Sequence, residues 1–260
     1  MVVPDILALD FDGVVCDGLL EYFETAWQAY CLVFQPQVSD PPTGLAERFY
    51  PLRPVVESGW EMPLVLYGLL HGVADDAILD HWPQLIPQLF TQARVDAARL
   101  GEAVDGVRDR WISGNLASWL ALHRFYPGVL PRVQQALEQG VQVRIISTKE
   151  GRFIQQLLAQ QGVDLAPDWI LGKEVKQPKY ETLRQLKTAR QKAAPDIWFV
   201  EDRIKALQAV QQQPDLAALP LFLADWGYNT ERDRAIAAQS DRIHSLSLEQ
   251  FASPFQTWGR

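Results

Sequence analysis

The decisive stretch of this sequence is Ile6-Leu7-Ala8-Leu9-Asp10-Phe11-Asp12-Gly13, in which a short apolar run ends in two aspartates and a glycine. A buried strand that delivers carboxylates to its carboxyl end is a common way for an α/β protein to build a site. Because side chains alternate along a strand, Asp10 and Asp12 can share one side, with Phe11 turned away, if the chain stays extended. Gly13 permits a sharp, left-handed exit and a close approach of the backbone to a ligand. A strand followed by an acidic turn without function is the alternative interpretation, and the rest of the chain decides between the two.

The composition is that of an ordinary globular protein. The chain has 260 residues, 48% hydrophobic and 22% charged, and this length accommodates one large domain or a core with a smaller domain. The net charge of −8 gives no indication of a nucleic-acid partner or of an anionic membrane surface. The two cysteines argue against a disulfide framework and predict a reducing, cytoplasmic location. No apolar run approaches the length of a membrane span, so we expect no membrane partner.

A helical insertion interrupts the predicted core. From residue 18 to 124, apolar residues recur at helical spacing, as around Trp27 and Trp119, and strand-like alternation is scarce. Prolines divide the first part of this segment into short helices and loops. We therefore expect a mainly α-helical cap domain over residues 18–124 and a core domain made of residues 1–17 and 125–260.

Strands and helices alternate from residue 126 onward. Strand-like runs lie at 141–147, 168–171, 197–202 and 219–225, and helix-like segments lie at 129–140, 152–161, 180–192 and 204–212. This alternation predicts a Rossmann-like parallel sheet covered by helices on both faces. Pro220 suits an edge strand or the beginning of a strand better than a central position. Three predicted strands end in groups that suit phosphate or metal, and such ends converge on one crevice: Asp10 with Asp12, Ser147, and Glu201 with Asp202.

These motifs resemble those of the haloacid dehalogenase-like (HAD) superfamily of phosphohydrolases, and the resemblance covers nearly the whole chain. The D-x-D-G motif of the family matches Asp10 and Asp12, and its strand-end Ser or Thr matches Ser147. A lysine before a helix is matched by Lys179, with Lys176 as the alternative. The insertion lies between the first and second motifs, as in a C1-type cap. The segment at 223–230 resembles the tail of a cyanobacterial and plastid subgroup.

The resemblance implies a phosphatase that acts on a small phosphorylated metabolite. In that chemistry Asp10 attacks phosphorus and forms an aspartyl-phosphate. Asp12 protonates the leaving oxygen and then deprotonates the water that releases phosphate. Ser147 donates a hydrogen bond to a phosphoryl oxygen, and Lys179 pairs with its charge. Asp12 argues against a dehalogenase, because displacement of halide needs no acid.

The resemblance also implies Mg²⁺, bound by Asp10, the main-chain carbonyl of Asp12, and Asp202. The fourth motif, Glu201-Asp202, departs from the family's common G-D-x-x-x-D form, so both acids are metal candidates. A phosphomutase uses the same aspartates, and a catalytically weak phosphate-binding or regulatory protein is the alternative from another class. Other polar residues are candidates for a substrate contact, although packing or turn roles are at least equally well supported: Arg53, Trp60, Glu61, Asp225 and Asn229.

Overall fold

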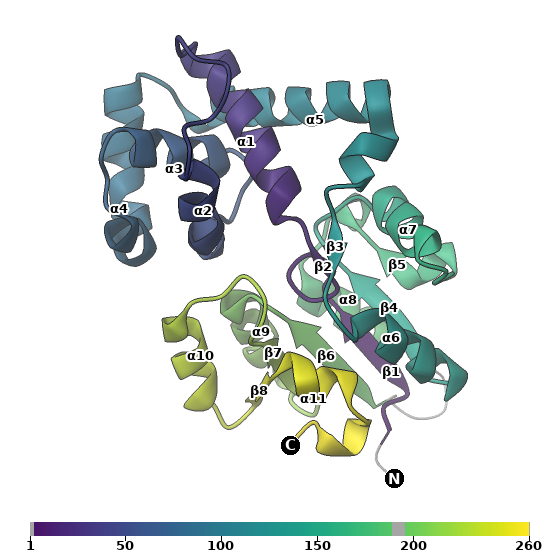
Figure 1. Cartoon of the computed structure of the whole chain (residues 1–260). Coiled ribbons are helices and arrows are strands. Elements are labelled where there is room, and N and C mark those ends of the chain that lie inside the picture. The colour runs from purple at the N-terminus through teal and green to yellow at the C-terminus, as the bar shows by residue number, and fades with distance from the viewer. Residues whose placement is uncertain (1–2, 189–195, 260) are drawn as a thin grey trace. The chain divides into compact units, whose positions relative to one another are not determined.

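The structure is a computed structural model that describes residues 3–188 and 196–259 (Figure 1). The chain divides into two compact units. The core unit consists of Met1–Asp17 with Arg124–Arg260, and the insertion consists of Gly18–His123. Each unit is described below by itself.

A parallel sheet forms the centre of the core unit, as the sequence predicts, and it has six strands in the part of the chain that the structure describes. The strand order is β5-β4-β1-β6-β7-β8, so β1 lies between β4 and β6. Where the chain leaves the core and returns to it, β2 pairs with β3 in a separate antiparallel ladder. The strands are β1 (Ile6–Leu9), β2 (Cys16–Asp17), β3 (Arg124–Phe125), β4 (Gln142–Ile146), β5 (Ile170–Leu171), β6 (Ile197–Glu201), β7 (Leu221–Ala224) and β8 (Ile243–Leu246).

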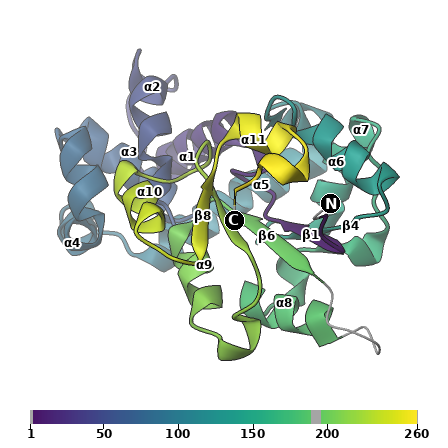
Figure 2. The ribbon, with the colours of Figure 1, turned by 90° about the horizontal axis from the view of Figure 1, so that it is seen from below.

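Helices cover both faces of this sheet. Figure 2 shows α6 and α11 on one side of the strands and α8 and α9 on the other. The helices of the core unit are α6 (Val129–Glu138), α7 (Gly151–Gln160), α8 (Lys179–Thr188), α9 (Ile204–Gln211), α10 (Glu231–Ala238) and α11 (Leu248–Ala252). Short 3₁₀ turns are η2 (Pro167–Trp169), η3 (Lys173–Val175), η4 (Pro214–Leu216) and η5 (Phe255–Thr257).

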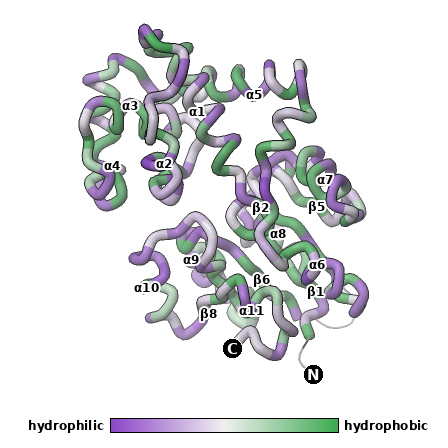
Figure 3. The backbone as a smooth tube through the Cα atoms, in the orientation of Figure 1, coloured by the Kyte–Doolittle hydropathy of each residue, from purple (hydrophilic) through white to green (hydrophobic). Residues whose placement is uncertain are grey.

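The central strands are buried on both faces because helices pack on each. Successive side chains of a strand point to opposite faces, so Phe199 packs with Leu207 of α9 while Trp198 points the other way. The Trp198 ring lies 5.4 Å from Phe222 and 5.7 Å from Trp258 between ring centroids. Figure 3 shows hydrophobic residues along β6 and hydrophilic ones at the start of α10. The apolar residues of β6 form the near-continuous run expected of a strand that is buried on both faces of a parallel sheet.

Three details differ from the sequence-based expectations. The strand predicted at 168–171 is shorter, because its first residues form η2 and only Ile170–Leu171 pair with β4. The strand β8 was not predicted. The edge alternative for Pro220 is wrong, because β7 pairs on both sides; Pro220 instead precedes the strand, where it need not donate a ladder hydrogen bond. The last residues of the predicted helix 180–192 lie outside the described residues.

The insertion is helical, as its periodicity predicts. Its helices are α1 (Leu19–Phe34), α2 (Leu45–Phe49), α3 (Glu61–Leu70), α4 (Asp75–Ala93) and α5 (Ala97–Leu120), with the 3₁₀ turn η1 (Tyr50–Val55). Glu21 of α1 is fully buried and accepts hydrogen bonds from Arg108 Nε (2.7 Å) and Trp119 Nε1 (3.1 Å), both of α5. These bonds satisfy a buried charge and tie α1 to α5. No helix within the described ranges is long and apolar enough to cross a membrane.

Candidate active site

The sheet order brings three of the predicted strand ends together. Asp10 directly follows β1, Ser147 directly follows β4, and Glu201 ends β6 with Asp202 next. The register aligns Leu9 of β1 with residues of both neighbouring strands. The groups therefore lie at the carboxyl edge of three adjacent strands, where open α/β sheets bind ligands.

Three carboxylates gather at this edge. Asp10, Glu201 and Asp202 are all buried, and each offers one oxygen within 4.8 Å of the others. Burial, followed by repulsion from Glu201, raises the pKa of Asp10 to about 7. Burial, followed by repulsion from Asp10, also raises the pKa of Asp202. The cluster therefore carries more negative charge than its surroundings solvate, which is the condition under which a cation binds.

Lys179 is the cation that this cluster holds. Its Nζ lies 2.9 Å from Asp10 Oδ2 and 2.6 Å from Glu201 Oε2. Burial alone would lower the pKa of Lys179, but Asp10 and Glu201 together raise it above its usual value. The other predicted lysine, Lys176, makes no ion pair with a described residue and adopts a left-handed φ of 52° in the loop before α8. Of the two candidate lysines before α8, the geometry thus favours Lys179.

The two acids at the end of β6, Glu201 and Asp202, have different surroundings. Glu201 Oε1 accepts a hydrogen bond from the Arg203 amide (3.0 Å), and Oε2 binds Lys179. Asp202 Oδ2 accepts a hydrogen bond from the Tyr228 amide (2.7 Å), but Asp202 Oδ1 is buried and has no hydrogen-bond partner among the described residues. An orphaned buried carboxylate oxygen is costly unless a cation satisfies it. Asp202 therefore fits a metal ligand better than Glu201 does.

Gly13 makes room for Asp202. Its φ is +86°, and a Cβ atom built on it would lie 2.1 Å from Asp202 Oδ2. The left-handed exit expected at Gly13 is present, and its backbone closely approaches a carboxylate. Asn229 Nδ2 donates to the Asp202 carbonyl (3.2 Å) and to the Ala224 carbonyl (2.8 Å), so Asn229 links the backbone at Asp202 to the end of β7.

Asp12 is not one of the three carboxylates of the acidic cluster. The strand β1 ends at Leu9, so the extended course that would put both aspartates on one side does not continue through Asp12. The Asp12 carboxylate instead lies 3.1 Å from Lys149 Nζ. Ser147 Oγ, also buried, accepts a hydrogen bond from the Lys149 amide (3.2 Å). Lys149 was not among the candidates predicted from the sequence, although its position two residues after a strand-end serine is a signal that the sequence contains.

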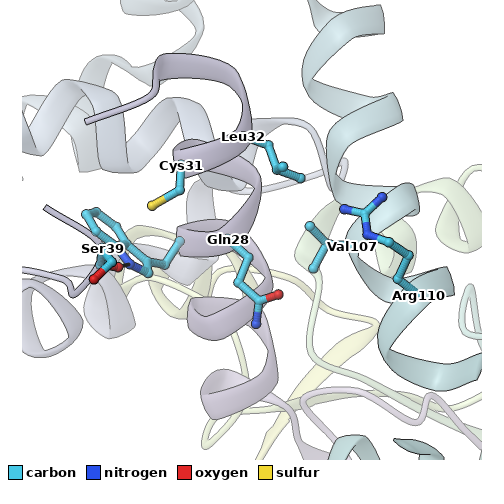
Figure 4. Close-up of a pocket in the computed structure, with 7 residues that line it drawn as sticks. Gln28, Cys31, Leu32, Ser39, Val107 and Arg110 are labelled. Atoms are coloured by element: carbon cyan, nitrogen blue, oxygen red, sulfur yellow. Dashed lines mark hydrogen bonds between the residues drawn. The ribbon is translucent and has the colours of Figure 1, made fainter. Parts of the chain in front are cut away.

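The polar candidates in the insertion have structural partners there. The buried Glu61 accepts hydrogen bonds from Trp82 Nε1 (3.0 Å) and from the Glu57 amide (2.6 Å), so it fastens the start of α3. Arg53 Nη1 donates to the Val56 carbonyl (2.8 Å). A separate cavity of about 350 Å³, shown in Figure 4, is lined by insertion residues only: Trp27, Gln28, Cys31, Leu32, Ser39, Val107 and Arg110.

Comparison with solved structures identifies the fold. A predicted phosphoglycolate phosphatase from Haemophilus somnus matches with a TM-score of 0.59 at 16% identity, over 97% of this chain and 96% of that chain. A haloacid dehalogenase-like family hydrolase from Streptococcus pneumoniae matches with a TM-score of 0.56 at 14% identity, over 94% and 93%. The fold is the HAD-like one. A protein tyrosine kinase from Mycobacterium tuberculosis also matches, with a TM-score of 0.56 at 13% identity, over 96% and 97%.

These likenesses show the architecture of the HAD-like fold, with a helical insertion after the first strand. A fold does not determine a reaction, so any reaction has to be inferred from the residues of the site. No protein-family model matches the chain, and no curated protein matches it. The three matching bacterial structures give no support to the resemblance to a cyanobacterial and plastid subgroup.

Proposed function

We propose that the protein is a Mg²⁺-dependent phosphatase that hydrolyses a small phosphorylated metabolite through an aspartyl-phosphate on Asp10. The observation that carries the proposal is the buried cluster of Asp10, Glu201 and Asp202, whose carboxylate oxygens lie within 4.8 Å of one another. Lys179 forms an ion pair with Asp10 in this cluster. A phosphoryl group under attack spreads negative charge over its oxygens, so its catalysis requires fixed positive charge beside a nucleophile. The cluster supplies the nucleophile and a place for a cation, and Lys179 supplies a fixed positive charge beside them.

The carboxylates fit a hard divalent cation. Asp10 and the orphaned oxygen of Asp202 are oxygen donors of the type that Mg²⁺ prefers, with the main-chain carbonyl of Asp12 as the third proposed donor. Glu201 is a further metal candidate in the same cluster. Its Oε2 accepts a hydrogen bond from Lys179, so we also assign Glu201 to anchoring that lysine. A bound Mg²⁺ would neutralise phosphoryl charge that the carboxylates otherwise repel.

The residues of the chain then divide the chemistry. Asp10 attacks phosphorus as the bond between phosphorus and the ester oxygen breaks, and Asp12, in its protonated form, gives that oxygen a proton. In the second step Asp12 takes a proton from water, which attacks phosphorus and frees Asp10. The Ser147 hydroxyl donates to a phosphoryl oxygen, because the backbone contact with Lys149 uses only its acceptor side. Lys179 pairs with the phosphoryl charge.

The decisive experiment is the hydrolysis of an aryl phosphate with and without Mg²⁺, in the natural protein and in Asp10→Asn. We expect activity that depends on Mg²⁺ and is lost in Asp10→Asn while circular dichroism shows an intact fold. Asp225→Asn is the matched control, because Asp225 follows β7 at the same edge of the sheet but does not belong to the acidic cluster. Full activity of Asp10→Asn would refute the mechanism.

A panel of phosphorylated metabolites then addresses the alternatives. Release of inorganic phosphate supports the phosphatase, whereas transfer within a sugar phosphate without release would indicate a phosphomutase. Binding of phosphate esters with no turnover across the panel would indicate a regulatory protein. The separate pairing of Asp10 and Asp12 with lysines favours catalysis, because simple phosphate binding needs neither aspartate.

A further inference from the structure

A second lysine faces the second aspartate. Lys149 Nζ lies 3.1 Å from Asp12 Oδ1, and the two side chains are 9% and 16% exposed. We propose that Lys149 is a positioning residue that holds the Asp12 side chain in place for proton transfer from its protonated carboxyl group to the leaving group. This inference rests on the proposed phosphatase function and adds a residue to it.

The backbone fixes Lys149 from two directions. Its amide donates to Ser147 Oγ (3.2 Å), within the turn that follows β4. Its carbonyl accepts a hydrogen bond from the Lys173 amide (2.9 Å), within the loop that follows β5. A lysine side chain normally has large conformational freedom, and a fixed main chain together with burial reduces it. The ammonium group is therefore a defined partner for Asp12 and differs from a mobile surface charge.

The two ion pairs divide the two aspartates. Lys179 forms ion pairs with Asp10 and Glu201, whereas Lys149 forms an ion pair with Asp12. The turn that carries Asp12 is closed by a hydrogen bond from the Gly13 amide to the Cys16 carbonyl (2.8 Å), so its backbone is also defined. Without Lys149 the Asp12 side chain would have a fixed backbone but free rotamers. Proton transfer requires heavy atoms within hydrogen-bond reach, so such rotation would be costly.

A role through Asp12 has a specific kinetic signature. An aryl oxide leaves readily without a proton, whereas an alkoxide requires one. Loss of Lys149 should therefore slow the hydrolysis of an alkyl phosphate far more than that of an aryl phosphate. A lysine that only attracted the phosphoryl group would affect both substrates equally, mainly through KM.

The experiment compares Lys149→Met, Lys149→Arg and Asp12→Asn on p-nitrophenyl phosphate and on glycerol phosphate with Mg²⁺. We expect Lys149→Met to lower kcat about 100-fold for the alkyl ester and less than about tenfold for the aryl ester, within the range that a positioned acid contributes. Lys149→Arg should restore most of the difference. Lys173→Met is the matched control, because its exposed side chain makes no ion pair with a described residue, and it should leave both rates unchanged.

Several outcomes would overturn the inference. An equal loss on both esters in Lys149→Met, beside a selective loss in Asp12→Asn, would make Lys149 a phosphate contact or a structural residue. Unchanged rates in Lys149→Met would remove any role. If the natural protein hydrolyses neither ester, the proposed function fails instead. A double-mutant cycle of Lys149→Met and Asp12→Asn in urea unfolding then tests the pair alone: additive midpoints would refute it, and non-additive midpoints would support it.

Discussion

Replacing Gly13 by alanine tests how closely the site is packed. The residue has a φ of +86°, which costs an alanine about 1–2 kcal/mol. The added Cβ would lie 2.1 Å from Asp202 Oδ2, and that oxygen cannot swing aside without breaking its hydrogen bond to the Tyr228 amide. Overpacking of this kind costs about 1–3 kcal/mol, so we expect Gly13→Ala to lower the free energy of unfolding by about 2–5 kcal/mol in total.

The assay is urea unfolding of the metal-free protein, followed by calorimetric titration with Mg²⁺. Gly140→Ala is the matched control, because Gly140 has a φ of +81° and nothing lies within 4 Å of its built Cβ. It should show only the backbone cost, with unchanged Mg²⁺ affinity. Gly13→Ala should also weaken Mg²⁺ binding by about tenfold or more, since it displaces Asp202. Equal destabilisation by the two substitutions, with equal Mg²⁺ affinity, would refute the reasoning.

Three further predictions concern the same region. The pKa of Asp10 is raised above its ordinary 3.8 to about 7, so the folded state binds this proton more tightly than the unfolded state does. The resulting contribution to the free energy of unfolding is present at low pH and is lost as pH rises through about 7. The melting temperature of the metal-free protein should therefore fall as pH rises from about 4 to about 7, and the increase in melting temperature caused by Mg²⁺ should grow over the same range; a constant increase would contradict this. Glu201→Gln should cost about 3 kcal/mol in urea unfolding because Lys179 loses a buried partner, and a cost below about 1 kcal/mol would show that Lys179 does not depend on Glu201. Tyr228→Phe removes the bond from its hydroxyl to Asp17 (2.8 Å) and should cost about 1 kcal/mol without changing Mg²⁺ affinity measured by calorimetry, because Asp202 binds the Tyr228 amide; weaker Mg²⁺ binding would contradict that assignment.

The sequence is sufficient to predict where the acidic centre forms. Parallel strands point the same way, so residues that directly follow apolar runs must meet at one edge once the alternation of strands and helices is established. Asp10, Ser147 and Asp202 were identified on that basis. That the three residues lie side by side follows from the strand order β4-β1-β6, because each of them directly follows one of these adjacent strands.

Pairings between side chains were not predictable, because they depend on the order of the strands and on loop courses. Lys149 meets Asp12 only because β4 lies next to β1, and Glu201 meets Lys179 and the Arg203 amide only through the course of the loops beside β6. The strand β8 was missed for a local reason. It lies at the edge of the sheet, and His244 and Ser245 in its middle interrupt the apolar run that marks the buried strands.

The small ladder between β2 and β3 also bears on how such a protein can diversify. Asp17 pairs with Arg124, so the chain enters and leaves the insertion at adjacent residues of one antiparallel pair. Because this pair holds the two ends of the insertion together, each doubling of the length of the insertion adds only about 0.6 kcal/mol to the entropic cost of closing it. Helices between Asp17 and Arg124 can therefore be lengthened, shortened or exchanged over evolutionary time while the sheet and its acidic edge stay intact.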